Sequence, residues 1–167
     1  MTNYSVNTFF HLDWPKEACD SLKKVVNCVL EEKSPNSPDI QSLGTHTREV
    51  LLRFLESYEP LGVNIEDHPD GGIVVEDKDG MFAPNMMADL LSAIMKDHEI
   101  PGVVSFAWAE KSGHEVSGGE AVISSDTIYM THLSDLIERM RRLEKTFEKI
   151  VFKNDEEPKE TPPTPWW

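Results

Sequence analysis

The sequence predicts an α+β fold in which helices cover a largely antiparallel sheet of about five strands. Several segments place apolar residues three and four positions apart, as an amphipathic helix does, and others alternate apolar and polar residues, as a half-buried strand does. These segments follow one another in the order ααββαβββα, and turns join some of the strands. The chain has 167 residues, 39% of them hydrophobic, which suits one domain with its own core.

Two helices are expected within the first sixty residues. Residues 3–12 mix polar and aromatic side chains and predict a strand or an extended arm. A helix with one apolar face follows over about residues 15–32, and a proline-containing loop separates it from the next helix. Thr45 or Thr47 can cap this second helix, which ends before Pro60.

The middle of the chain changes to the period of a strand. Residues 63–75 alternate apolar and polar positions around a turn-rich connector, which predicts a β-hairpin with one apolar face. A third helix begins at Pro84 and is stopped by Pro101 and Gly102.

The last third predicts three more strands and a final helix. The strand over residues 104–109 has a bulky face and a small face, so Trp108 is expected to be buried beside Phe106. A loop is predicted from Glu110 to Gly119, followed by two short strands joined by a turn. The final helix begins near Leu133.

The charge is unevenly distributed along the chain. The net charge is −14, and residues 61–132 carry thirteen acidic and three basic residues. This region repels the phosphates of nucleic acid and attracts basic protein surfaces, including those that hold nucleic acid. The alternative is that the acidic residues only keep the protein in solution. As partner contacts we single out Glu66, Asp67, Asp70, Glu76, Asp77 and Asp79.

The final helix forms a basic stripe on this acidic chain. Arg139 and Arg142 are the candidate contacts for a second subunit or partner. The alternative is intramolecular pairing with acidic residues three or four positions away on the same helix.

We expect a single domain over residues 1–153 and a tail over residues 154–167. The tail is acidic, then proline-rich, and ends in Trp166 and Trp167. Proline lowers the entropy lost on docking, and tryptophan is enriched at interface hot spots. The two indoles are therefore predicted to dock on a partner or second subunit, or else to fold back onto their own domain.

The cysteines and the absence of targeting segments favour a cytoplasmic protein. Cys19 and Cys28 lie nine positions apart in one predicted helix, so about 13 Å separates them and they cannot pair within it. No stretch approaches the roughly 18 apolar residues of a membrane span, and no secretory signal is recognisable.

A resemblance adds a biological setting. The segment Val104–Ala109, with its Ser-Phe-Ala-Trp sequence, is followed by Gly118–Ser124, in which a Gly-Gly turn leads into a Val-Ile-Ser strand. Over about residues 61–132 the chain resembles uncharacterised small acidic α+β proteins of phages, plasmids and other bacterial mobile elements. The resemblance brings no activity and no functional residues with it. It implies a protein that acts on host machinery by binding it.

The sequence predicts no catalytic residues, no metal site and no cofactor. The glycines of residues 113–119 lack the Lys-Ser/Thr pair of a phosphate loop and lead into a strand. The six histidines show no metal-ligand spacing. A site assembled from distant residues, with His114 beside an acidic partner, stays open as the enzymatic alternative.

These observations favour a non-enzymatic protein-binding module of a mobile element. Its partner is expected to be a host protein, with inhibition of a basic nucleic-acid-handling or defence complex as the concrete form. Two alternatives remain: a small enzyme with a site near residues 110–119, and an oligomeric structural or accessory protein joined by its last helix and tail.

We expect no measurable binding of the chain to duplex DNA at physiological salt, because residues 61–132 repel phosphate. A gel-shift assay measures this directly. Tight, salt-sensitive binding would contradict the charge argument.

Overall fold

The computed structural model describes residues 4–57, 61–113, 115–135, 138, 141 and 142. The chain divides into two compact units, Met1–Leu133 and Ser134–Trp167. The sheet and the helices named below all lie in the first unit. The predicted domain boundary at residue 153 and most of the predicted final helix lie outside the described residues, so both stay predictions.

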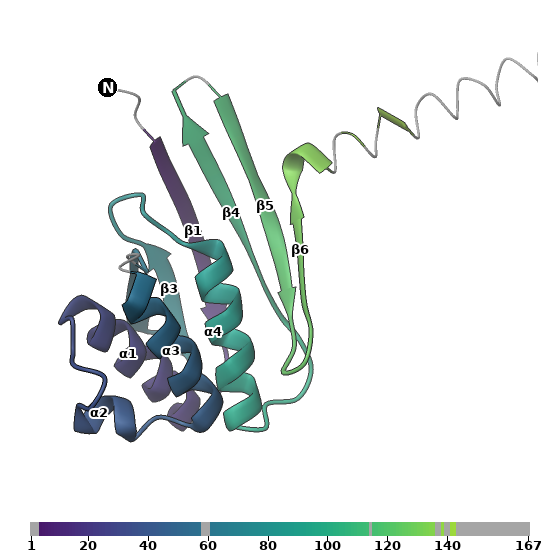
Figure 1. Ribbon diagram of the computed structural model, residues 1–167. Helices are drawn as coiled ribbons and strands as arrows, with labels where there is room; N and C mark the ends of the chain where they lie inside the picture. The colour runs from purple at the N-terminus through teal and green to yellow at the C-terminus, as the bar shows by residue number, and fades with distance from the viewer. Residues whose placement is uncertain (1–3, 58–60, 114, 136–137, 139–140, 143–167) are drawn as a thin grey trace, which may run out of the picture. The chain divides into compact units, whose positions relative to one another are not determined.

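The sheet has six strands, each antiparallel to its neighbours (Figure 1). Its order is β2-β3-β1-β4-β5-β6, so β2 and β6 are the two edges. This confirms the predicted α+β class, with one strand more than expected. The strands are β1 (Tyr4–Leu12), β2 (Val63–Asp67), β3 (Ile73–Asp77), β4 (Val104–Ser112), β5 (Glu115–Ile123) and β6 (Ile128–His132).

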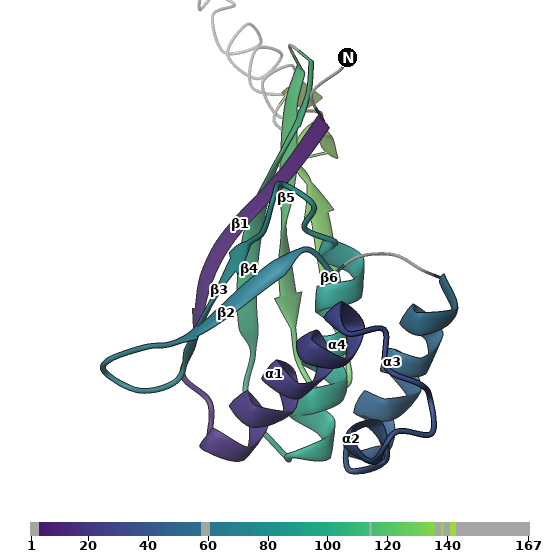
Figure 2. The ribbon, with the colours of Figure 1, turned by 90° about the vertical axis from the view of Figure 1, so that its left-hand side faces the viewer.

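Four helices among the described residues gather on one side of the sheet (Figure 2). They are α1 (Lys16–Leu30), α2 (Pro38–Gln41), α3 (Thr45–Ser57) and α4 (Pro84–Asp97). Helix α4 contacts both α1 and α3 and has eight buried residues among its fourteen, so it is the central element of the helical layer. Short α2, capped by the Ser37 hydroxyl, replaces part of the loop expected after α1.

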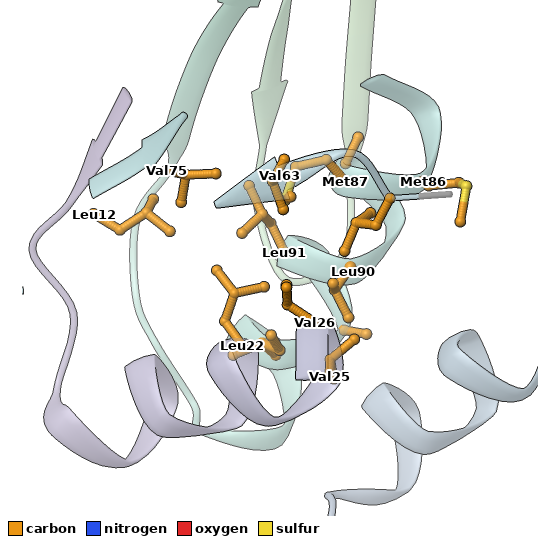
Figure 3. Close-up of a cluster of buried hydrophobic side chains, with 14 of the residues drawn as sticks. Leu12, Leu22, Val25, Val26, Val63, Val75, Met86, Met87, Leu90 and Leu91 are labelled. Carbon is orange, nitrogen blue, oxygen red and sulfur yellow. The ribbon is translucent and has the colours of Figure 1, made fainter. Parts of the chain in front are cut away.

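The core lies between this helical layer and the sheet. Figure 3 shows the meeting of α1, α4 and the strands, where Leu22 and Leu91 are fully buried and Leu12 and Val75 come from β1 and β3. Burying an aliphatic side chain of this size contributes roughly 1.5–3 kcal/mol, so this cluster dominates the stability of the fold.

The predicted order ααββαβββα is incomplete at its start, because the first element is the strand β1. This strand lies inside the sheet, between β3 and β4. Its alternation is obscured in the sequence because Thr8, a polar residue, occupies a core position between Val6 and Phe10. The Thr8 hydroxyl donates a hydrogen bond to the carbonyl oxygen of Ala107, 2.7 Å away, which satisfies it inside the core.

The loop predicted over residues 110–119 is wrong, because β4 and β5 continue as a long hairpin. Glu110 pairs with Ser117 and Ser112 pairs with Glu115. The described side chains of this hairpin over residues 110–119 are mostly polar and exposed, so the sequence there shows no alternation of apolar and polar residues. Backbone hydrogen bonds between β4 and β5, and between β4 and β1 on its other side, hold this part of the hairpin together without burial of side chains.

The two cysteines lie on α1, as predicted, and both are free and buried. Burial raises the pKa of each thiol, which keeps both protonated and unreactive at neutral pH.

The start of α3 is capped by a residue that comes from α4. The Asp97 carboxylate accepts hydrogen bonds from the backbone N–H groups of His46 and Thr47, at 3.1 and 2.8 Å, and from His46 Nδ1 at 2.8 Å. The sequence predicted a cap from Thr45 or Thr47, and the structure satisfies these N–H groups from fifty residues away. Burial by itself would raise the pKa of Asp97, but the hydrogen bonds outweigh burial and hold the pKa below its usual value.

We expect Asp97→Ala to lower the free energy of unfolding by about 2 kcal/mol at neutral pH, because it leaves the first N–H groups of α3 unsatisfied.

The folded-state pKa of Asp97 is lowered, so its contribution to stability is complete above the unfolded-state pKa near 4. It is lost as the pH falls through the folded-state value. Denaturant melts between pH 2 and 7 measure both effects, with Asp89→Ala on the same helix as the control. Equal acid sensitivity in wild type and Asp97→Ala would contradict this account.

Candidate protein-binding surface

One face of the sheet is not covered by any described helix. Residues at alternate positions of each strand point to this side, and in β1 these are Asn7, Phe9 and His11, all exposed. Phe9 is the most prominent, with 70% of its surface accessible. We call this side the uncovered face; its apolar members are Phe9, Val74, Ala107, Ala109, Val122 and Tyr129.

Phe9 lies near the middle of the uncovered face. Its register partner on β3 is Glu76, and on the other side β1 pairs with β4, where Ala107 and Ala109 are exposed. Small residues on β4 leave the phenyl ring projecting above its neighbours. An exposed ring among small side chains is typical of an anchor that a partner can enclose.

Two of the six predicted acidic contacts meet on this face. Glu66 of β2 and Glu76 of β3 both accept a hydrogen bond from the side-chain amide of Asn64, each at 3.2 Å. Glu120 of β5 lies on the same face and is exposed. Acidic groups thus lie on both sides of the apolar centre.

The other four predicted acidic residues lie elsewhere. Asp67 points to the helical side, where it pairs with Lys23 Nζ of α1 at 2.5 Å. Asp77 accepts hydrogen bonds from the N–H groups of Thr8 and Gly80, so it holds the turn after β3. Asp70 lies in the connector between β2 and β3, and Asp79 occupies a left-handed backbone conformation with φ 61°. The six predicted acidic residues therefore do not form one continuous acidic surface.

The predicted contacts of the C-terminal region are described only in part. Arg142 Nε pairs with Glu138 Oε1 at 3.1 Å, which is the intramolecular i,i+4 pairing that the sequence left open. Arg139, Trp166, Trp167 and His114 lie outside the described residues, and their roles stay predictions.

Phe9 was missed by the sequence analysis. The signal that could have revealed it is the pair Phe9-Phe10: adjacent residues of a strand point to opposite faces, so one of the two rings must leave the core. The structure buries Phe10, which stacks on Phe106 with ring centroids 5.1 Å apart, and leaves Phe9 outside.

A cavity of about 980 Å³ lies on the helical side, bordered by α1, α3, β2 and the turn after β3. Its lining is mainly apolar, and it includes Leu30, whose surface is 58% accessible, and the predicted contact Asp79. The volume is within the range of small-molecule sites, so this cavity is the second candidate surface. Its apolar lining is Val26, Val29, Leu30, Leu52, Phe54, Leu55, Leu61, Val63 and Met81, with Pro35.

A contact between a serine and a histidine, which could suggest a nucleophile, does not form one here. Ser21 Oγ lies 3.0 Å from the carbonyl oxygen of Glu17 and 2.9 Å from His98 Nε2. The carbonyl only accepts, so it takes the single hydroxyl proton and Nε2–H donates to Oγ. His98 is therefore not a base toward Ser21. Within the described ranges, no three His, Cys, Asp or Glu side chains are grouped as a metal ion would need.

Gly118 and Gly119, which the sequence predicted as a turn, lie within strand β5 and have a packing role. Trp108 is 6% accessible and lies beside Phe106, as predicted, with ring centroids 6.0 Å apart. A Cβ at Gly119 would lie 2.5 Å from Trp108 Cζ2, and one at Gly118 would lie 2.2 Å from the Trp108 carbonyl oxygen. The two glycines let β5 approach β4 closely enough to enclose the indole.

No family model, no curated protein and no solved structure matches the chain. The resemblance to mobile-element proteins therefore stays a prediction. Among the helices that the structure describes, none is long and apolar enough to cross a membrane.

We expect Trp108→Ala to lower the free energy of unfolding by about 3–5 kcal/mol, because it leaves a large cavity on the core side of β4 and β5. Gly119→Ala should cost about 1–3 kcal/mol, since its added methyl would lie 2.3 Å from the Thr131 backbone oxygen and would overlap the indole. Denaturant melts measure both, and Ser105→Ala, on the exposed side of the same strand, is the control. A loss below about 1 kcal/mol for Trp108→Ala would show that the indole is not a core residue.

Proposed function

We propose that this chain is a non-enzymatic protein-binding module of a mobile element that binds a basic host protein through the uncovered face. The observation that carries the proposal is Phe9, 70% accessible near the middle of a sheet face that no described helix covers. Inhibition of a nucleic-acid-handling or defence complex is its concrete form, and the cytoplasm is the expected compartment.

The chemistry of the uncovered face supports this choice of partner. An apolar centre flanked by charged groups is the usual arrangement of a protein interface, in which an aromatic anchor is enclosed and the rim stays hydrated. Here the flanking charges are Glu66, Glu76 and Glu120, with Lys111 as a basic neighbour toward the end of β4. Acidic groups outnumber this lysine, so the complementary rim is rich in lysine or arginine. Basic surfaces of this kind are common on proteins that hold nucleic acid.

The region that carries the uncovered face also favours protein over nucleic acid. Residues 61–132 supply five of the six strands and carry a net charge of −10. This charge repels phosphate and speeds the approach of a basic protein at low salt. The buried thiols of Cys19 and Cys28 need no oxidising compartment, in keeping with the proposed location.

The cavity beside α1 is the second candidate for partner binding, because its apolar lining includes the exposed residues Leu30 and Met81. It lies on the helical side of the sheet, so one substitution on each side distinguishes the two surfaces. Phe9→Ser and Leu30→Ser form a matched pair, since each removes one exposed apolar side chain.

We expect Phe9→Ser to weaken partner binding at least tenfold while leaving the melting temperature nearly unchanged, because Phe9 makes few contacts in the isolated chain. Leu30→Ser should leave binding unchanged. The partner is first captured from host lysate with the tagged full-length chain, and the purified pair is then measured by calorimetry at two salt concentrations.

Three results would bear against the proposal. Loss of binding in Leu30→Ser but not in Phe9→Ser would move the site to the cavity. An acidic partner, or affinity that does not fall with salt, would contradict the charge argument. Deleting residues 162–167 in the same assay tests whether Trp166 and Trp167 add to the contact, as the sequence predicts.

A further inference from the structure

The two edges of the sheet differ in how they are guarded. Edge strands expose unpaired backbone groups, and proteins commonly protect them with charge, proline or a covering element. Strand β2 carries Glu66 and Asp67, and the ion pair from Lys23 to Asp67 links it to α1. Strand β6 carries no acidic residue, no lysine or arginine and no proline over Ile128–His132.

The unguarded edge also exposes apolar surface. Ile128 is 37% accessible and Tyr129 is 52% accessible, and these two residues point to opposite faces of the sheet. Within the described residues, β6 pairs with β5 on one side and with no strand on the other. The nearest acidic or basic residues along the chain are Asp126 before the strand and Asp135 after it.

We propose that β6 pairs antiparallel with β6 of a second copy of this chain, so that one continuous sheet runs through both copies. This inference does not rest on the proposed function. A twofold axis at Met130 sets Tyr129 opposite Thr131 of the other copy, and Ile128 opposite His132. Each Tyr129 then meets a β-branched threonine, one of the favourable cross-strand pairs of antiparallel sheets.

Of the two sheet edges, charge allows a second copy at β6 and disfavours one at β2. Two copies with a net charge of −14 each repel one another, so they associate most readily where the surface is uncharged. Pairing β2 with β2 would bring Glu66 and Asp67 of both copies together. The β6 edge is compatible with itself, because with Met130 on the axis it brings no acidic residue, lysine or arginine of one copy against the other.

The first test is the mass of the full-length chain in solution. Analytical ultracentrifugation over a hundredfold range of concentration should show a dimer for wild type. Tyr129→Lys should weaken dimerisation at least tenfold, because it places a charge on each side of the axis, whereas Asn64→Lys on the β2 edge should not. Circular dichroism confirms that each variant is folded.

The second test fixes the register. Two cysteines introduced by Met130→Cys would face each other across the axis at about 4.5–5.5 Å between Cα atoms, within reach of a disulfide. Those of Ile128→Cys would be about 13 Å apart. With oxidised glutathione, Met130→Cys should give a covalent dimer, whereas Ile128→Cys and Asn64→Cys should stay uncrosslinked; the native thiols of Cys19 and Cys28 are buried.

The inference is overturned by a monomer at every concentration, by a dimer that Tyr129→Lys leaves intact, or by cross-linking of Ile128→Cys as readily as Met130→Cys. A dimer that is lost only when residues 143–167 are removed would also overturn it, since association would then depend on the C-terminal region.

Discussion

The one-sided covering of the sheet is the constraint from which the rest of the structure follows. The helical layer buries alternate residues of β1, β3, β4 and β5, and α4 anchors this layer by packing on the sheet and capping α3 through Asp97. Because a strand has only two faces, fixing Phe10 and Leu12 in the core commits Phe9 and His11 to solvent. The uncovered face is thus the direct consequence of the core.

Much of the fold could be predicted from the sequence, and the failures have physical causes. The helices and the β2–β3 hairpin have clear apolar periods. The sequence does not distinguish β1 from an extended arm, because Thr8 interrupts its alternation. It predicts a loop in place of the β4–β5 hairpin, because backbone pairing holds this hairpin without an apolar face. The cap of α3 by Asp97 joins residues fifty positions apart, which no local pattern reveals.

For the candidate site too, the sequence indicates residue types, whereas contacts between distant parts of the chain appear only in the structure. Acidic composition indicated Glu66 and Glu76, but it could not show that Asp67 is drawn to Lys23 or that Asp77 is occupied by backbone N–H groups. Phe9 belongs to no charged or repeated motif, so only the assignment of faces in β1 reveals it. The contrast between the guarded β2 edge and the unguarded β6 edge likewise appears only once the strand order is known.

The central claim is that Phe9 is the anchor of the partner contact. Hydroxyl-radical footprinting of the chain alone and in its complex tests it most directly, because the method reports the accessibility of Phe, Leu and Met side chains in one experiment. The account predicts that Phe9 reacts readily in the isolated chain and is protected in the complex, while Leu30 and Met81 beside the cavity react equally in both. Protection of Leu30 and Met81 with Phe9 still reactive would contradict it.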